Sequence, residues 1–453
     1  MRAVFLVLLA VFLALYVLAE VTLDRPPQDG IVRLRWATDP APARGFQTRT
    51  FARMFPGIEV SVDPGDRIKL IAQCATGTGP DIVDIYSKAE MYSFVQAGIL
   101  LDLTDYARAM GFGPEATYPA LKDALCINGR QYRFPRNVYA NCVVFNKTVF
   151  DDLGLAYPAR NWTYGDLARI GRAIRQGNSK SGRKYIPVAN WNNLFFFNDL
   201  LIGCGGRYFS EDGLTSRLDS PEAVAAMQLY HDLMHVYRVI PTTAEASAVS
   251  SQGGWGGALN WFSGGKAAMI FIGRWYILQV PHFPDLKGAL ASVQLPRVGD
   301  QPSAGVVDAG APGINAKSRH VKEALKFLQY LASPEYGRLI VADGDSLPPN
   351  PDLAGSGADL VNDAVDDPGF HQPFIDAVRA ARPLDFSPFI DAGLTQRWLA
   401  ETIGQIENQV AEPGPAMRSL AAEINQKIHK NLRRRSDLQR VYLRITGQPY
   451  RGD

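Results

Sequence analysis

Beyond the first thirty residues, short stretches of strand periodicity alternate with stretches of helical periodicity, and this alternation restricts the possible folds more than any other feature. Residues 32–36 alternate apolar and basic side chains, as a strand with one buried face does. A helix is predicted over 46–55, where a Pro-Gly pair ends it, and alternation returns at 58–62. The apolar stretch 82–86 is the next predicted strand. Strands that alternate with helices predict an α/β fold with a largely parallel sheet.

Helix start signals recur later in the chain. Thr163 with Asp166 has the pattern of a capping box with an acidic third residue. Ser220 and Ser333 each precede Pro-Glu, which supplies an N-cap, a proline at the first helical position and an acid in the first turn. Further strands are predicted at 142–145, 268–272 and 289–295.

The composition excludes several classes of protein. With 47% hydrophobic and 20% charged residues the chain is not intrinsically disordered, and a length of 453 residues favours two or three domains. The 47 basic and 45 acidic residues leave a net charge of +2, which gives no general attraction to nucleic acid. Four cysteines cannot form a disulfide framework in this length. One bridge is possible, and Cys126–Cys142 closes the shortest loop, but unpaired buried cysteines are an equal alternative.

The N-terminus predicts export. Every residue of 3–19 is Ala, Val, Phe, Leu or Tyr, and Glu20 ends the run. The run lies between the roughly 7–15 residues of a signal-peptide core and the roughly 20 of a spanning helix. A cleaved signal peptide over 1–19 and an uncleaved membrane anchor therefore both stay open. In either case Arg2 favours an orientation that leaves the rest of the chain periplasmic or extracytoplasmic, with 20–30 as a linker.

The other end of the chain is basic. Six Lys and Arg residues lie between 427 and 440. Contact with an acidic surface such as lipid headgroups is one interpretation, and a solvated helix face is the commoner cause of such a run. We expect 431–453 to form a basic C-terminal tail.

Motifs of catalysis and of metal or cofactor binding are missing from the sequence. No GxGxxG, GxxxxGK[ST] or GxSxG occurs. His231 and His235 share a helix face at the spacing of zinc ligands, but Asp232 replaces the glutamate of the metalloprotease motif and no third ligand is evident. Asp343 and Asp345 begin like a calcium loop that lacks its closing acid. We therefore expect no metal and no cofactor.

Polar and aromatic residues instead gather where predicted strands end. Ligands of open α/β sheets bind beyond the carboxyl ends of strands, flat rings suit the faces of sugars, and polar side chains suit hydroxyls. The candidate ligand-binding residues are Asp39, Tyr86, Arg136, Asn137, Tyr139, Trp191, Asn192, Trp261, Arg274, Trp275 and Asp308.

Nine short segments follow one another in an order that is more specific than any one of them. They are 55–60 (FPGIEV), 77–83 (GTGPDIV), 132–135 (YRFP), 144–147 (VFNK), 161–167 (NWTYGDL), 220–223 (SPEA), 265–269 (GKAAM), 273–275 (GRW) and 314–318 (INAKS). The ordered set resembles the family 1 extracellular solute-binding proteins, the maltose-binding-protein-like subunits that bind sugars for ABC importers.

The resemblance implies a two-lobed periplasmic-binding-protein fold of type II. Each lobe would be a sheet flanked by helices, with the ligand cleft between the lobes. Lobe 1 would comprise 31–139 and 292–333, and lobe 2 would comprise 140–291 and 334–430. By position, the tyrosines and tryptophans named above would stack on the ligand, and the other candidates would donate or accept hydrogen bonds. Arg136 and Arg274 would suit a carboxylate-bearing sugar as well as a neutral one.

The function that the resemblance implies is binding without catalysis. A monomer would capture a sugar or oligosaccharide by hinge closure and deliver it to the membrane permease subunits of an ABC transporter. Membrane association would run through residues 3–19 if that segment is retained. Two alternatives stay open, namely a membrane-tethered ligand sensor with the same fold and an exported glycan hydrolase whose acid pair is not recognised.

Overall fold

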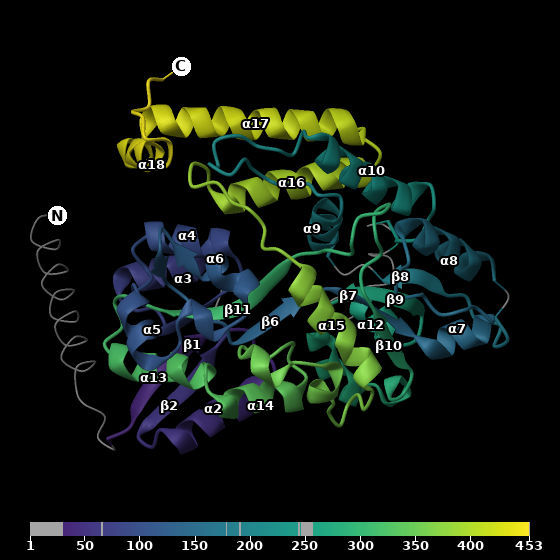
Figure 1. Cartoon of the computed structure of the whole chain (residues 1–453), viewed down its shortest axis with the longest axis horizontal. Helices are drawn as coiled ribbons and strands as arrows, with labels where there is room; N and C mark the ends of the chain where they lie inside the picture. The colour runs from purple at the N-terminus through teal and green to yellow at the C-terminus, as the bar shows by residue number, and fades with distance from the viewer. Residues whose placement is uncertain are drawn as a thin grey trace, which may run out of the picture.

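The computed structural model describes residues 30–64, 67–177, 179–189, 192–242, 245 and 257–452. Within these ranges the chain forms two main β-sheets, each flanked by helices (Figure 1). A two-stranded ribbon, β4 (Cys126–Ile127) with β5 (Arg130–Gln131), is separate from both. The α/β fold class and the two-sheet architecture are thus confirmed.

The first sheet has the order β2-β1-β3-β11-β6. Its strands are β2 (Ile58–Asp63), β1 (Val32–Ala37), β3 (Ile82–Ile85), β11 (Val307–Ile314) and β6 (Asn137–Ala140). β1 pairs in parallel with β2 and β3, and these three strands lie where the sequence pattern predicts them. β11 runs antiparallel to both β3 and β6.

The second sheet has the order β10-β7-β9-β8. Its strands are β10 (Leu290–Val293), β7 (Cys142–Asn146), β9 (Ala267–Ile272) and β8 (Ile186–Ala189). Only β8 and β9 pair in parallel. The prediction of a largely parallel sheet is therefore wrong. Both sheets are mixed. In the first, β11 arrives after a passage through the second sheet and runs against its neighbours, and in the second, β7 runs against β9 and β10.

The chain passes from the first sheet to the second within one residue. Asn141 alone separates β6 from β7, close to the expected boundary after residue 139. The return passage lies between Val293 and Val307, so the expected boundary at 292 falls inside β10, which pairs with β7. The lobe boundary on the return passage therefore belongs after β10.

Two consecutive helices cover the first sheet. They are α13 (Val321–Leu331) and α14 (Pro334–Asp343), and α14 buries Tyr336 and Ile340 in the cluster that holds Trp36. The sequence placed 334 onward in the second lobe. Two residues between α13 and α14 are too few to reach the other sheet, so α14 stays with the first.

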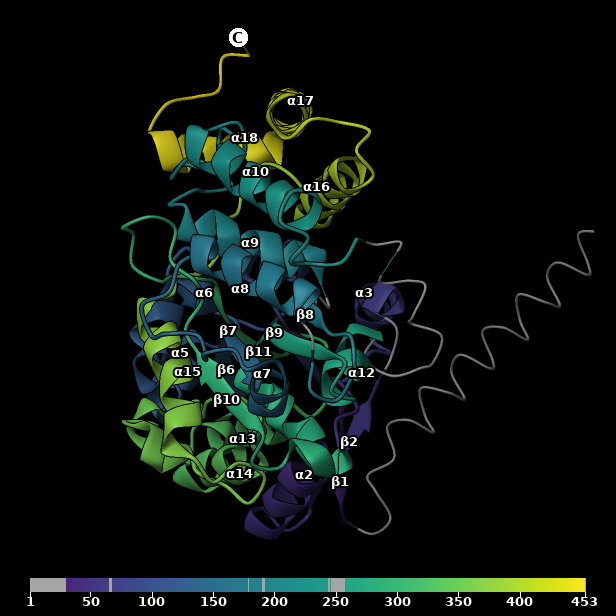
Figure 2. The same ribbon diagram turned by 90° about the vertical axis from the view of Figure 1, so that its right-hand side faces the viewer.

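Three C-terminal helices, α16 (Ala392–Glu407), α17 (Pro413–Arg434) and α18 (Ser436–Thr446), form a layer at the outer edge of the molecule with α10 (Pro221–His235) (Figures 1 and 2). The helix that precedes them, α15 (Pro368–Ala380), packs against β6, β7 and β10 instead. α17 crosses the expected boundary at 430. Leu432 and Leu438 belong to the hydrophobic core that packs on the second sheet, here called the second core. The expected basic tail is thus mostly packed helix, because apolar residues alternate with its charges at helical spacing.

The predicted helix starts are confirmed. Thr163 caps α8 (Tyr164–Gln176) in a reciprocal capping box with Asp166. Ser220 and Ser333 accept hydrogen bonds from backbone N–H groups at the starts of α10 and α14.

All four cysteines are free. Among the residues with described positions, no helix combines the length and apolarity needed to cross a membrane. The apolar run 3–19 and residues 20–29 of the expected linker lie outside the described residues.

Candidate functional site

Side chains from both sheets line a cavity of about 780 Å³. Its first wall is formed where β1 and β3 end, together with β6, β11 and α2 (Ala43–Met54). Its second wall comes from α9 (Asn193–Gly203), from the turn η3 (Arg274–His282) that follows β9, and from Gln396 of α16. The volume lies within the range of small-molecule sites, roughly 300–1,000 Å³.

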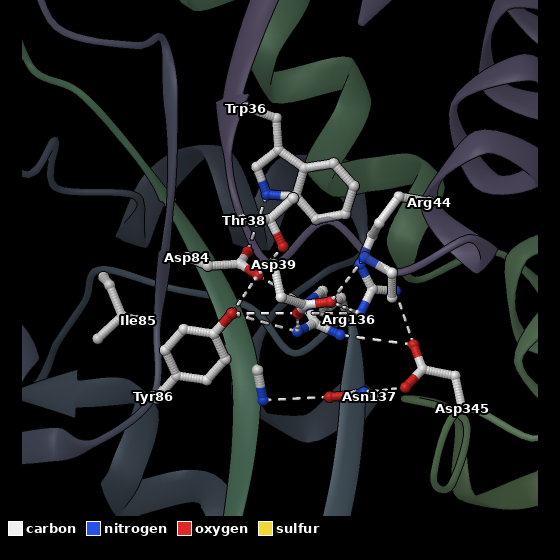
Figure 3. Close-up of polar contacts among 12 residues, drawn as sticks. Trp36, Thr38, Asp39, Arg44, Asp84, Ile85, Tyr86, Arg136, Asn137 and Asp345 are labelled. Carbon is white, nitrogen blue, oxygen red and sulfur yellow. Dashed lines mark hydrogen bonds and ion pairs between the residues drawn. The ribbon is translucent and has the colours of Figure 1, made fainter. Parts of the chain in front are cut away.

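A network of buried charged side chains around Arg136 forms part of the first wall of the cavity (Figure 3). The Arg136 Nε donates to Asp84 at 2.7 Å, and one Nη donates to Asp39 at 2.5 Å. Its other Nη lies 3.5 Å from Asp345. The Arg136 side chain is 3% exposed and the Asp84 side chain is not exposed at all. Trp36 and Thr38 also donate to Asp84, at 2.8 and 2.5 Å.

A second arginine joins the same carboxylates. The Arg44 guanidinium donates to Asp345 at 2.6 Å and to both oxygens of Asp39 at 3.1 Å. Asn137 donates to the other Asp345 oxygen at 2.9 Å. Three carboxylates thus share two guanidinium groups.

The network fixes the ionisation of its members. Burial acts to raise the pKa of Asp39, but the charges of Arg136 and Arg44 outweigh it and hold that pKa at about 2. Burial likewise opposes the charge of Asp345, whose pKa is nevertheless lowered by the same two arginines. Burial raises the pKa of Tyr86 to about 12, so its hydroxyl stays neutral and donates to Asp39 at 3.2 Å.

Glycine makes room for the central arginine. A Cβ atom on Gly310 of β11 would lie 2.7 Å from the Arg136 guanidinium carbon, so the guanidinium packs directly against the β11 backbone. The Arg136 backbone N–H donates to the Gly310 oxygen at 2.7 Å, and Asn137 accepts from the Gly310 N–H at 3.1 Å.

Aromatic rings face the cavity from both walls. Phe46 of α2 and Phe195 of α9 are 57% and 41% exposed, which is unusual for large apolar side chains. Trp275 lies across Gly273, where a Cβ atom would be 2.7 Å from the indole Cδ1. Tyr86 and Tyr139 complete the set. Rings on opposite walls are suited to hold a flat or ring-shaped solute between them.

Three further carboxyl groups line the cavity with weak compensation or none. Asp199 accepts from Asn141 at 2.7 Å and from the Val306 N–H at 3.0 Å, and burial raises its pKa to about 6. Burial also raises the pKa of Asp308 to about 6, although Arg133 lies 3.4 Å away. The pKa of Asp343 is raised to about 6 by burial and by the neighbouring Asp345 charge.

The structure brings seven of the eleven candidate residues to this cavity. They are Asp39, Tyr86, Arg136, Asn137, Tyr139, Trp275 and Asp308. Asn192 caps α9 by accepting from the Phe195 N–H at 3.1 Å, so it positions a lining ring and does not line the cavity itself. Trp191 lies outside the described residues.

Two candidates are buried away from the cavity. Trp261 is 3% exposed and packs in a hydrophobic core, because its position in a helix beside β9 turns the indole inward. Arg274 is 1% exposed and donates to the backbone oxygens of Ser346 and Leu360 at 2.7 and 2.5 Å. Its guanidinium ties the segment after α14 to the end of β9. The expectation that Arg274 offers donors to a ligand is therefore wrong.

Sequence reasoning missed several lining residues. Phe46 and Phe195 lie inside predicted or apolar helical stretches, where only the exposure of the ring in the folded chain separates a binding ring from a core ring. The sequence distinguishes Asp343 and Asp345 only by their spacing, which is that of an incomplete calcium loop and not of a ligand-binding wall. Asp199 has no distinguishing signal in the sequence, whereas Arg44 follows the first predicted strand as Asp39 does but is not among the candidates.

The structure offers no metal site among the residues that it describes. The His231 and His235 rings lie 4.9 Å apart, and Asp232 is 3.0 Å from His231, but no further ligand joins them.

Comparison with known proteins places the chain in a family. Residues 35–338 match the bacterial extracellular solute-binding proteins. The diacetylchitobiose binding protein DasA of Streptomyces coelicolor is 28% identical over 192 residues, which is 42% of each chain. An arabinooligosaccharide-binding protein of Halalkalibacterium halodurans is 23% identical over 58% of this chain and 56% of its own. The chain thus matches less than two thirds of the length of either relative.

Solved structures agree in fold. An ABC substrate-binding protein from Listeria monocytogenes, in complex with cycloalternan, superposes with a TM-score of 0.74 at 20% identity. The match covers 88% of this chain and 99% of that one. At this identity the likeness shows the fold alone. Since the family match spans well over half of the sequence and the fold agrees, the chain belongs to the bacterial extracellular solute-binding proteins, a family that binds solutes and is not enzymatic.

Proposed function

We propose that the protein captures a sugar or oligosaccharide in the cavity between its two sheets and delivers it to the permease of an ABC transporter. The observation that carries the proposal is the two-sided lining, with Phe46 and Tyr86 on one wall and Phe195 and Trp275 on the other. Rings suit the apolar faces of sugars, and the carboxylate and amide groups between them suit hydroxyls.

Hinge closure would supply the selectivity. The walls are joined where Asn141 separates β6 from β7, and that residue also lines the cavity. A ligand held by both walls makes its full set of contacts only when they approach, so binding favours the closed form. The permease would recognise that form.

The named ligands of related proteins support a carbohydrate. The three relatives described above carry diacetylchitobiose, arabinooligosaccharide and cycloalternan in their names or titles. These are different compounds, so they support the class of ligand and leave its identity to experiment.

Thermal unfolding with a panel of mono- and oligosaccharides tests the proposal. We expect at least one carbohydrate to raise the melting temperature of the purified chain, because a ligand that binds only the folded state stabilises it. Trp275→Ala and Phe195→Ala should each weaken the binding of that ligand about tenfold, because an aromatic side chain that packs on a ligand contributes about 1–3 kcal/mol to the binding free energy.

Tyr106→Ala is the matched control. Tyr106 is an aromatic residue of α5 (Thr104–Met110) that is 44% exposed and does not line the cavity. Affinity should stay unchanged in this variant. The proposal fails if no sugar, polyol or sugar acid stabilises the protein, or if Tyr106→Ala weakens binding as much as Trp275→Ala does.

We further propose that the protein works beyond the cytoplasmic membrane, where its family acts, and that residues 3–19 direct it there. N-terminal sequencing of the protein from cells distinguishes a chain that has lost this segment from one that retains it. A start at Glu20 gives a diffusing carrier, whereas a retained apolar segment gives an anchored one.

A further inference from the structure

We propose that the solute held in this cavity carries a positively charged amino group, so that the site takes a cationic sugar or oligosaccharide and rejects an anionic one. This inference rests on the proposed function, because it names the chemistry of the ligand of the same cavity.

The arginines of the cavity wall are already occupied. The three nitrogens of the Arg136 guanidinium each face a carboxylate, on Asp84, Asp39 and Asp345. The Arg44 side chain is 3% exposed, and its two Nη atoms face Asp345 and Asp39. No other Lys or Arg lines the cavity within the described part of the chain. An anionic ligand would therefore find no free cation here.

Carboxylates outnumber cations at the wall. Five aspartates line the cavity, namely Asp39, Asp199, Asp308, Asp343 and Asp345, against the two arginines. Asp84 lies behind the wall and shares Arg136, so the buried network holds three negative and two positive charges. Asp199 adds a charge that only neutral donors contact, Asn141 and the Val306 N–H.

A buried carboxylate without a cation is costly, and the protein shows that cost in its ionisation. Burial raises the pKa of Asp199, Asp308 and Asp343 to about 6. An ammonium group beside any one of these carboxyl groups would lower the pKa of that group, and the same charge interaction would stabilise the bound ligand. A neutral sugar offers no such gain.

Two polar atoms of the wall also lack partners. The Ser346 side chain is fully buried, and its Oγ has no hydrogen bond with any described residue. Its backbone is held at a φ of 66°, with its oxygen accepting from Arg274 at 2.7 Å. The Asp343 Oδ2 is likewise buried without a described partner. Both residues belong to the cavity lining, so the wall keeps two hydrogen-bond acceptors that no described residue uses.

The aromatic rings fit the same ligand. Tyr86, Tyr139, Phe195 and Trp275 line the same cavity as these carboxylates. Ring faces attract ammonium groups through their quadrupole, and the effect grows when the cation is removed from water. Carboxylates and rings together are the lining that an amino sugar requires.

Matched disaccharides test the inference. The probes are β-1,4-linked glucosamine disaccharide and cellobiose, which differ only by two amino groups in place of hydroxyls, and a glucuronate-bearing disaccharide. Calorimetry at pH 7 with the purified chain should give a Kd for the amino disaccharide at least about tenfold below that for cellobiose, with no binding of the glucuronate.

Charge variants and pH locate the effect. Asp343→Asn should reduce the preference for the amino disaccharide by about threefold, because it removes one carboxylate with an unpartnered oxygen. Asp366→Asn, at an exposed position outside the cavity, should leave it unchanged. Affinity for the amino disaccharide should rise from pH 5 to 7, as the carboxyl groups with pKa near 6 ionise, and fall above about pH 8, as the amine loses its proton.

Equal or tighter binding of cellobiose or of the glucuronate would overturn the inference and leave the proposed function standing. A loss of preference in Asp366→Asn equal to that in Asp343→Asn would overturn it too. Failure of every carbohydrate to bind would overturn both this inference and the proposed function.

Discussion

At the scale of single residues, the site depends on one arginine held by three carboxylates. Arg136 fits because Gly310 leaves the backbone of β11 bare beneath its guanidinium. The arginine cannot move away from an added methyl group, because Asp39, Asp84 and Asp345 hold it on three sides.

Gly310→Ala should therefore destabilise the protein by about 1–3 kcal/mol, the usual cost of overpacking a well-packed site. Gly404→Ala is the matched control. Gly404 lies inside α16 with no atom within 4 Å of an added Cβ, so alanine there should stabilise by about 0.5–1 kcal/mol. Urea unfolding measures whether each variant lowers or raises the free energy of unfolding. Equal stability of Gly310→Ala and the unaltered protein would contradict the account of Arg136.

Residue types alone indicated part of this site. Asp39 and Tyr86 follow predicted strands, and the structure places both at the cavity because the ends of β1 and β3 meet. Arg274 also follows a predicted strand, and Trp261 lies in a Gly-rich stretch before it, yet both are buried, because each lies beside β9 where loops and helices cover it. The position of a residue in the sequence could not show whether its side chain lines the cavity or is buried elsewhere.

At the scale of elements, local chemistry determines where the helices begin. The capping box at α8 joins Thr163 and Asp166 in both directions, at 2.9 Å from the Thr163 N–H and 3.2 Å from the Asp166 N–H. Such signals act within four residues and so are visible in the sequence. The direction of a strand in a sheet depends on how distant segments pair, and for this reason the local sequence pattern does not predict the mixed sheets.

Thr163→Ala should lower the free energy of unfolding by about 1 kcal/mol, because an N–H at the start of α8 loses its acceptor. Thr48→Ala in the middle of α2 provides the comparison, since the Thr48 hydroxyl donates to backbone oxygens of its own helix, on Arg44 at 3.0 Å and on Gly45 at 3.4 Å, and caps no helix end. That variant should change stability by less than about 0.5 kcal/mol. Thermal and urea unfolding of the pair will test the difference, and equal losses would argue against a specific role of the cap.

At the scale of the whole molecule, the C-terminal helices complete the second core. α17 buries Met417, Leu420, Ile424, Ile428 and Leu432, each no more than 3% exposed. Full burial of such side chains is worth about 1.5–3 kcal/mol each, which together approaches the whole stability of a typical domain.

A chain that ends at Glu412 should therefore fail to fold stably, as seen by limited proteolysis and a lost unfolding transition. A chain that ends at Thr446 loses mainly exposed residues and the half-buried Tyr450, and it should melt within a few degrees of the full chain. A stable, cooperative fold of the shorter chain would show that α17 is an accessory and not part of the core.

The sequence by itself determined the local structure and the class of protein. Alternation placed β1 and β2, an apolar stretch placed β3, capping residues placed the helix starts, and an ordered set of segments indicated the family that the comparison confirms. The strand and helix signals need only neighbours in the chain. The tertiary structure decided which of many polar and aromatic residues meet. Burial and exposure at a given position depend on what packs from distant segments, as Asp345 meets Arg44 across 301 residues. The charge balance of the cavity, invisible in a net charge of +2, is a consequence of that packing.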